Sequence, residues 1–332
     1  MKIVRLIFLV LHLGILFLLL CTLLNAYVPP KVFPWFNLLS LGFPVLIITY
    51  FLLIFFWIFS WKKRAFIFLF CSLAFINPIK RWINYSAEGK DAADLKIISF
   101  NTKGAEFGQK NIEYYINSKN ADVVLLQEDG DKDFKFGELK KSNLERMYIV
   151  SLFTKHKIVA HKILIMGNYN DFNAYADQND IEIKGKTYRF INLYLQPFKF
   201  EKKMVKLDGN SDEDKQKIKN VVKRLIPTFK LHQEQIEIIR KAIDESPYPV
   251  FVAGDFNSVP NSYEYYHLSE GLKDAFVEVG RGSATSFHDY KFPLRIDYIF
   301  TSPSIKPINY QVDRSVRLSD HFPVISTFSL EK

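Results

Sequence analysis

The pattern of apolar and charged residues changes sharply near residue 90 of this 332-residue chain. Before that point, two long runs at residues 6–24 and 36–59 carry no charged side chain, and only His12 interrupts the first. Because an α-helix needs about 20 apolar residues to cross a bilayer, both runs predict transmembrane helices. A third run, from residue 65 to 76 or 79, is short for a span. Residues 1–90 therefore predict a membrane anchor with two to three transmembrane helices.

The first apolar run also has the basic start of a cleaved signal peptide, at Lys2 and Arg5. However, the run is long, and no pair of small residues with the spacing of a cleavage site precedes Tyr27. A buried helix of a soluble core is the other alternative, and uncharged runs of this length argue against it. We therefore predict that the anchor is retained.

Basic residues beside the spans predict the orientation of the anchor. Lys2 and Arg5 precede the first span, residues 62–64 are all basic and follow the second, and the loop between the two spans has only Lys31. The positive-inside rule places the N-terminus and the 62–64 loop in the cytoplasm. With three spans, the C-terminal domain then lies outside the cytoplasm; with two spans, it would lie inside. We predict the extracytoplasmic arrangement.

Beyond residue 90, short apolar runs alternate with segments of helical periodicity, which predicts one domain over residues 91–332. Helices are expected at 109–119 and within 201–245, where the charged stretch 201–220 is a solvated helix face or a mobile loop. The expected strands are 95–101, 121–128, 158–166, a hairpin over 180–195 that turns near 184–186, 250–256, 296–302 and 323–330. Such a succession of strands and helices is typical of a compact α/β sandwich.

The charge of the chain is concentrated in the anchor. Residues 1–93 hold nine of the 44 basic and two of the 35 acidic residues, which leaves 35 basic and 33 acidic residues in the other 239. A nearly neutral domain is a poor match for a long polyanion, so nucleic acid is possible as a substrate but not favoured. Both cysteines, Cys21 and Cys71, lie in apolar runs. Any metal in the domain must therefore be bound by oxygen or imidazole, which suits Mg²⁺, Mn²⁺ or Ca²⁺.

Polar side chains lie at or near the ends of six predicted strands. They are Asn101, Glu128, Tyr194, Asp255 with Asn257, Arg295 with Asp297, and Ser319 with Asp320 and His321. One Asp or Asn at a strand end is explained by turn formation alone. Six strands that offer acids, amides, a tyrosine and a histidine predict a shared rim, where binding and catalytic groups collect on a rigid scaffold.

The segments LKIISFNTKG, VVLLQE, GDFN, RIDYIF and LSDH, in this order, resemble the endonuclease/exonuclease/phosphatase superfamily. The apolar preface resembles that of a membrane-anchored bacterial branch. The resemblance implies a four-layer α/β sandwich of two packed β-sheets flanked by helices, and divalent-metal-dependent hydrolysis of a phosphoester. The chemistry is consistent with these residues, because a metal must neutralise a phosphate that repels hydroxide.

The resemblance implies a role for each of these side chains. Glu128 is the candidate metal ligand, Asn101 completes or orients the metal site, and Asp320 lies in the outer shell or binds a second ion. Asp255 holds and deprotonates the attacking water, and Asn257 donates a hydrogen bond to the phosphate. His321 contacts the phosphate or shares in proton transfer, and Asp297 fixes its tautomer.

Three further residues complete the predicted site. Tyr194 stands where many members have His, and it resembles the phenol that exonuclease III-type members use to contact phosphate. Arg295 and His288 are predicted to contact the substrate, Arg295 from a strand start and His288 from a loop before it.

These observations predict a monomeric, membrane-anchored phosphohydrolase and, more specifically, a phosphodiesterase. The substrate would be a phospholipid or its phosphorylated headgroup, or extracellular nucleic acid; the tether to a bilayer favours lipid. The alternative is a non-catalytic scaffold protein that retains the fold. A scaffold has no need of Glu128, Asp255, Asn257 and His321 together, which favours the enzyme.

Overall fold

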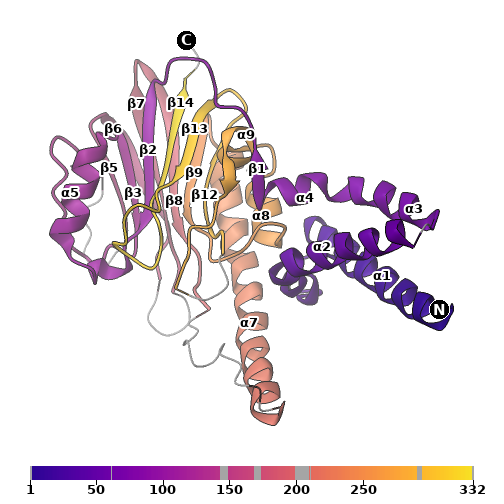
Figure 1. Ribbon diagram of the computed structural model, residues 1–332. Helices are drawn as coiled ribbons and strands as arrows, with labels where there is room; N and C mark the ends of the chain where they lie inside the picture. The colour runs from indigo at the N-terminus through magenta and orange to yellow at the C-terminus, as the bar shows by residue number, and fades with distance from the viewer. Residues whose placement is uncertain are drawn as a thin grey trace.

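The computed structural model describes residues 2–60, 62–142, 149–167, 173–198, 209, 211–289 and 294–330. The chain forms a β-rich domain, and the N-terminal helices, which are the predicted anchor and are named the anchor below, project from one side of it (Figure 1). The boundary between the two parts lies at β1 (Ile83–Tyr85), close to the change in composition near residue 90. β1 pairs with β11 (Arg281–Ser283) of the domain, so the end of the anchor is joined to the domain by backbone hydrogen bonds.

The anchor consists of three antiparallel helical segments (Figure 1). The first two are α1 (Lys2–Leu23) and α2 (Trp35–Phe59), separated by the 3₁₀ turn η1 (Leu24–Ala26). Both are long and apolar enough to cross a membrane. The third predicted run forms three short consecutive pieces, α3 (Arg64–Cys71), η2 (Ser72–Phe75) and α4 (Ile76–Lys80). Together they rise roughly 26 Å, close to the thickness of a bilayer core.

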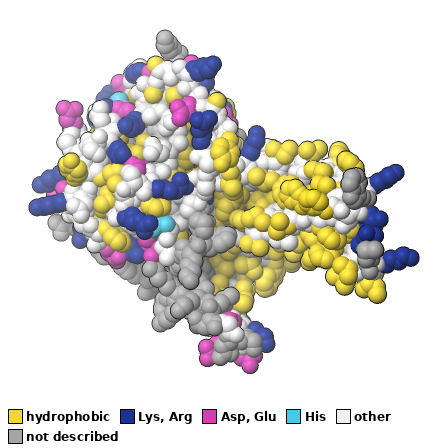
Figure 2. All heavy atoms as spheres, in the orientation of Figure 1, with side chains coloured by type: hydrophobic (Ala, Val, Ile, Leu, Met, Phe, Trp, Pro, Cys, Tyr) yellow, Lys and Arg dark blue, Asp and Glu magenta, His cyan; other side chains and the backbone are white. Residues whose placement is uncertain are grey.

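Many large apolar side chains of the anchor are exposed on its surface. Phe66 and Phe70 are 75% and 74% exposed, and Phe17 and Ile48 are exposed on α1 and α2. This apolar band runs along the anchor up to the domain, while Lys and Arg gather at the far end (Figure 2). The core helix of a soluble protein would bury such a surface, whereas lipid solvates it. The band is therefore an interaction surface, which a membrane or a protein partner would cover.

Within the described residues, the domain contains two six-stranded sheets. The first has the order β13 (Lys306–Val312), β14 (Val324–Ser329), β2 (Leu95–Asn101), β3 (Val123–Gln127), β5 (Val150–Thr154) and β4 (Lys140–Lys141). The second has the order β10 (Lys273–Asp274), β12 (Asp297–Thr301), β9 (Val250–Asp255), β8 (Lys186–Tyr194), β7 (Tyr175–Ile183) and β6 (Lys157–Ile165). Both sheets mix parallel and antiparallel pairs.

The two sheets pack face to face through an apolar core and are covered by helices outside. Leu95 and Val123 of the first sheet belong to one cluster with Phe190 and Phe251 of the second. Outside the first sheet lies α5 (Gln109–Lys119), and outside the second lie α7 (Ser211–Asp244) and α8 (Tyr263–Leu268). The short helices η3 (Lys103–Ala105) and α9 (Ala275–Val279) lie in connections. The predicted four-layer sandwich is confirmed.

The elements agree with the prediction where the residue pattern is strong. Strand 95–101 and helix 109–119 have the predicted bounds, but β7 begins five residues before the expected hairpin, in the polar stretch YADQN. β5 and β13 were not expected, because five residues are too few for a clear alternation and Pro307 is atypical within a strand. Of the charged stretch 201–220, residues 201–208 and 210 lie outside the described residues, and α7 begins at Ser211.

Buried polar contacts fix the anchor to the domain. Asn37 of α2 donates to both carboxylate oxygens of Glu264 on α8, at 3.0 and 2.9 Å, and accepts from the backbone N–H of Tyr263 at 2.7 Å. His232 of α7 lies 2.7 Å from the same carboxylate. Burial alone would raise the pKa of Glu264, but the hydrogen bonds from His232 and Asn37 outweigh burial and lower it. The carboxylate thus stays charged only because both neighbours are in place.

Substitution of Asn37 tests this docking contact. Asn37→Leu removes two donors from a buried carboxylate and one acceptor from a buried N–H, so we expect the free energy of unfolding to fall by about 3 kcal/mol. The measurement is the thermal unfolding of the full chain in detergent. Thr49→Val is the matched control, because that hydroxyl is exposed and bonds only within α2. Equal stability of the two variants would contradict the contact.

Candidate active site

The sheet topology brings the polar strand ends together at one edge. β2 runs parallel to β3, and β8 runs parallel to β9, so the carboxyl ends of each pair lie side by side. β12 and β14 are antiparallel to β9 and β2, and their first residues therefore lie at the same edge. In the register of β12 on β9, Asp297 stands directly opposite Asp255. The residues predicted at the rim thus come from both sheets.

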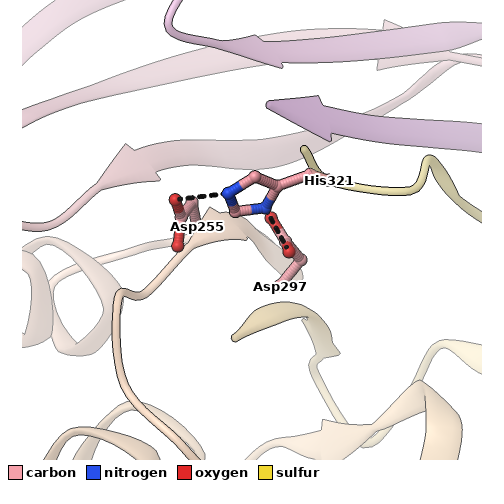
Figure 3. Close-up of side chains that lie close together, drawn as sticks. All are labelled: Asp255, Asp297 and His321. Carbon is pink, nitrogen blue, oxygen red and sulfur yellow. Dashed lines mark hydrogen bonds and ion pairs between the residues drawn. The ribbon is translucent and has the colours of Figure 1, made fainter. Parts of the chain in front are cut away.

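Asp255, Asp297 and His321 form a buried cluster, with the imidazole between the two carboxylates (Figure 3). His321 Nδ1 lies 2.8 Å from Asp297 Oδ2, and His321 Nε2 lies 3.7 Å from Asp255 Oδ2. At 1% to 4% exposure, all three are shielded from water. Asp297 therefore holds the proton on Nδ1 and directs Nε2 toward the cavity, the orientation that the sequence predicted.

Burial and mutual charge shift the proton affinities in this cluster. Burial raises the pKa of Asp255 to about 8, and Asp297 adds to the rise while His321 opposes it. For His321, burial disfavours the charged form, but the charges of Asp297 and Asp255 outweigh it and raise the pKa to about 10. At neutral pH, His321 is therefore a cationic donor, and Asp255 is mostly protonated in the metal-free protein. A divalent cation bound beside Asp255 would favour its carboxylate form.

Asn101 connects the cluster to Glu128. Its Nδ2 donates to Glu128 Oε1 at 2.9 Å and to Asp255 Oδ2 at 3.0 Å, and its Oδ1 accepts from the backbone N–H of Lys103 at 3.0 Å. In this arrangement the Asn101 amide orients two carboxylates, and its nitrogen and oxygen are both engaged in hydrogen bonds. Of the two roles expected for it, orientation is the one that the contacts favour.

Glu128 and Asn257 both adopt the left-handed backbone conformation at the cavity, which is strained for Glu128 and tolerated by Asn257. Glu128 has φ 46° and Asn257 has φ 45°, in the left-handed region that side chains other than Asn, Asp and His rarely adopt. Thr102 Oγ1 and the N–H of Gly104 hold the Glu128 carbonyl at 2.8 and 2.7 Å. The neighbouring Gly254 is required sterically, because a Cβ there would lie 2.0 Å from the carbonyl oxygen of Leu193. The surrounding loops therefore fix where Glu128 points.

Three other predicted residues lie around these groups. Tyr194 ends β8 and is buried, and burial together with the charges of Glu128 and Asp255 raises the pKa of its phenol well above the usual value. It is a neutral hydrogen-bond donor. The Asn257 N–H donates to Asp255 Oδ1 at 2.8 Å, and its Nδ2 donates to the carbonyl of Leu195 at 2.9 Å. Asp320 pairs with Lys103 Nζ at 3.0 Å.

Among the described residues, the charge balance at this edge fits a divalent cation. Glu128, Asp255, Asp297 and Asp320 supply four carboxylates, against the two cations Lys103 and His321. The nearest ligand atoms of Asp255, Asp297 and His321 lie within 4.8 Å of one another. Asp297 already binds His321 Nδ1, however, and a hard cation prefers oxygen to imidazole. The carboxylates of Glu128 and Asp255, joined by Asn101, are therefore the better pair for a hard cation.

The structure does not bring Arg295 and His288 into the cavity. The Arg295 guanidinium is buried, pairs with Asp274 at 2.7 Å and donates to the carbonyl of Arg81 at 2.8 Å. Its closeness to Asp297 in the sequence does not place the two side chains together, because β12 begins at Asp297 and Arg295 lies before the strand, where the regular alternation of side chains does not hold. His288 stacks on Phe322 at 4.1 Å. The substrate contact predicted for each is therefore not seen: Arg295 binds other parts of the protein, and His288 packs outside the described cavity lining.

A cavity of about 220 Å³ opens over the cluster. Six of the predicted residues line it: Glu128, Tyr194, Asp255, Asn257, Asp320 and His321. The rest of its wall was not predicted and includes Ser40 and Leu41 of α2 and Leu225 and Phe229 of α7. No sequence signal marks these residues, because a Leu or Phe on an apolar helix face is indistinguishable from core. Lys103, which holds Asp320, was not predicted either.

Comparison with known proteins identifies the architecture. A family model described as the Endonuclease/Exonuclease/phosphatase family matches residues 98–321, and a model described as a domain of unknown function matches residues 5–82. No curated protein matches the chain significantly.

Two similar solved structures come from Danio rerio and Bacteroides thetaiotaomicron. TDP2 of D. rerio, complexed with single strand DNA product, is 17% identical, with a TM-score of 0.51 over 71% of this chain and 98% of that chain. An endonuclease/exonuclease/phosphatase family protein from B. thetaiotaomicron is also 17% identical, with a TM-score of 0.51 over 72% and 98%. At this identity, the likeness establishes the fold.

The proton affinity of His321 can be measured directly. In the metal-free protein, we expect the His321 imidazole to stay protonated until the pH approaches 10. Asp297→Asn removes the larger of the two charges that raise this pKa, so the titration should move toward the ordinary value of about 6.5. NMR of ¹⁵N-histidine-labelled full chain measures both titrations. An unchanged midpoint in Asp297→Asn would contradict the assigned contact.

Proposed function

Because the chain belongs to the endonuclease/exonuclease/phosphatase family of phosphoester hydrolases, we propose that it is a membrane-anchored, divalent-metal-dependent phosphodiesterase. The observation that carries this proposal is the buried Asp255–His321–Asp297 cluster, joined through Asn101 to Glu128. A scaffold protein would gain nothing from burying these charges, each of which costs free energy to remove from water.

In the proposed reaction, a water oxygen bonds to phosphorus and one ester P–O bond breaks, which yields a phosphomonoester and an alcohol. Asp255 accepts a proton from the water, held in position by the Asn257 N–H and the Asn101 amide. His321 donates a hydrogen bond from Nε2 to a phosphate oxygen, while Asp297 retains its Nδ1 proton. The leaving alkoxide takes a proton from solvent water to form the alcohol, and Asp255 returns the proton that it accepted to the solvent. The second N–H of the Asn257 amide and the Tyr194 phenol are further donors on the cavity wall.

Glu128 and Asp255 would hold the divalent cation, with Asp320 on its outer side. The chemistry that Mg²⁺, Mn²⁺ or Ca²⁺ supplies when bound there is neutralisation of the phosphate charge and stabilisation of the leaving oxygen. The carboxylate excess described above supports such a cation, and the donor set of oxygens suits a hard metal.

The catalytic domain is proposed to lie outside the cytoplasm. The N-terminus and the α2–α3 connection lie at the end of the anchor far from the domain (Figure 1). Lys2, Arg5 and Lys62–Arg64 are therefore separated from the domain by the length of the apolar band. The positive-inside rule assigns that basic end to the cytoplasm. The return of the chain through α3, η2 and α4 supports three crossings.

Two substrate classes were expected, lipid and extracellular nucleic acid. Among the described lining residues, none is Lys or Arg. A long polyanion is usually bound through concentrated basic side chains, so the lining favours a substrate with one phosphate at the cluster over a nucleic acid strand.

Turnover of chromogenic esters tests the proposed function. The full chain in detergent should release nitrophenol from bis(4-nitrophenyl) phosphate faster than from 4-nitrophenyl phosphate, with Mg²⁺ or Mn²⁺ and not with EDTA. Asp255→Asn should lower kcat by about 10³-fold, because it removes the acceptor of the water proton. Asp91→Asn is the control, because the Asp91 carboxylate is exposed on the surface.

Metal binding gives a second test, which does not depend on turnover. Mg²⁺ should raise the melting temperature of the wild type and of Asp91→Asn, and Glu128→Gln should abolish the rise. A chain that shows neither turnover nor metal-dependent stabilisation would be a scaffold and not an enzyme.

A further inference from the structure

The end of the cavity away from the catalytic cluster is apolar and is shared between the anchor and the domain. Its described apolar lining includes Leu41, Pro197, Phe198, Leu225, Phe229 and Val259, whereas Phe287 packs on His321 at the cluster. Phe198 and Phe229 meet edge to face at 5.5 Å, and Leu225 and Phe229 are 2% exposed. Such a surface offers dispersion contacts along one side of a ligand whose other end is a phosphate.

The cavity also lies at the level where lipid headgroups are expected. Tyr27, 80% exposed, and Trp35, 49% exposed, flank the connection between α1 and α2, which contacts the domain through Asn25 and Lys31. Tyr and Trp gather at membrane interfaces, so these two mark the headgroup region. Ser40 and Leu41 follow Trp35 along α2 by about 8 Å, at the boundary between headgroups and acyl chains. A lipid could therefore reach the cavity from the side, beside α2, without leaving the bilayer.

We propose that this apolar end is a binding site for the hydrocarbon chain of a lipid phosphoester, with one wall formed by α2 and the other by α7. The scissile phosphate lies at Asp255 and His321, and the first part of the chain lies between Leu41, Phe198 and Phe229. A volume of about 220 Å³ holds the phosphate and only the beginning of a chain, so the remainder stays in the bilayer. The proposal rests on the proposed function and gives it a substrate class: the anchor is a part of the active site and not only a tether.

A pair of esters with the same leaving group separates the chain from the phosphate. We would compare kcat/KM for 4-nitrophenyl hexadecyl phosphate and 4-nitrophenyl ethyl phosphate, with the full chain in nanodiscs and Mg²⁺. The wild type should favour the hexadecyl ester at least tenfold. Leu41→Trp, which fills the apolar end, should lower the hexadecyl-to-ethyl ratio at least tenfold. Val10→Trp is the control, because it adds the same ring at an exposed position of α1, several helical turns from Leu41, and should leave the ratio unchanged.

A second readout does not depend on turnover. A hexadecyl phosphate with a diazirine near its phosphate end is photolysed with the Asp255→Asn protein, and the labelled peptides are identified by mass spectrometry. We expect labels concentrated around Leu41 and around residues 225–229, and loss of that label in Leu41→Trp.

The outcomes separate the two proposals. Labelling around Leu41 without hydrolysis of either ester would overturn the phosphodiesterase and retain the lipid site. Hydrolysis of both esters at one ratio in wild type and Leu41→Trp, with labels scattered over the exposed faces of α1 to α3, would retain the enzyme and overturn the lipid site. Faster cleavage of a single-stranded oligonucleotide than of the hexadecyl ester would also overturn it, in favour of nucleic acid.

Discussion

The Asn101 amide holds the two sheets of the domain in register at the place where the charges meet. It stands at the end of β2 in one sheet and donates to Glu128 of the same sheet and to Asp255 of the other. Because the amide is neutral, it can bridge two carboxylates that would otherwise repel each other in a low dielectric. The bridge continues into the rest of the charged cluster, because Asp255 faces His321, and His321 in turn binds Asp297.

Such a cluster is costly to bury, and its partners are what make it tolerable. Removing one partner from a buried ion pair costs about 3–5 kcal/mol, because the other charge is left unsatisfied. The left-handed backbone at Glu128 adds strain of about 1–3 kcal/mol. The fold keeps both features, which is the pattern expected where strain and buried charge serve a reaction. The same reasoning applies where the anchor meets the domain. There the buried carboxylate of Glu264 is bound by Asn37 of the anchor and by His232 of the domain.

A residue of the site could be predicted from the sequence where its position follows from its own strand end, and not where it follows from a contact with a distant segment. The strand ends at Asn101, Glu128 and Asp255 were predictable, because parallel strands bring successive carboxyl ends to one edge. Arg295 was not, since its partner Asp274 comes from a segment with no motif of its own. The wall supplied by Leu41 and Phe229 was also beyond prediction: apolar residues on long helices have no signature that separates lining from core, and only tertiary packing places α2 beside α7.

The central claim is that the metal site and the membrane anchor belong to one rigid unit. It is tested most directly by pulsed electron paramagnetic resonance between bound Mn²⁺ and a nitroxide on α2. Val45→Cys would carry the label, in a full chain whose Cys21 and Cys71 are replaced by alanine, in nanodiscs. The account predicts one narrow distance, matching that from the Glu128–Asp255 pair to residue 45, which disappears in Glu128→Gln. A broad distribution with Mn²⁺ still bound would mean that the anchor is a flexible tether, and would contradict the account.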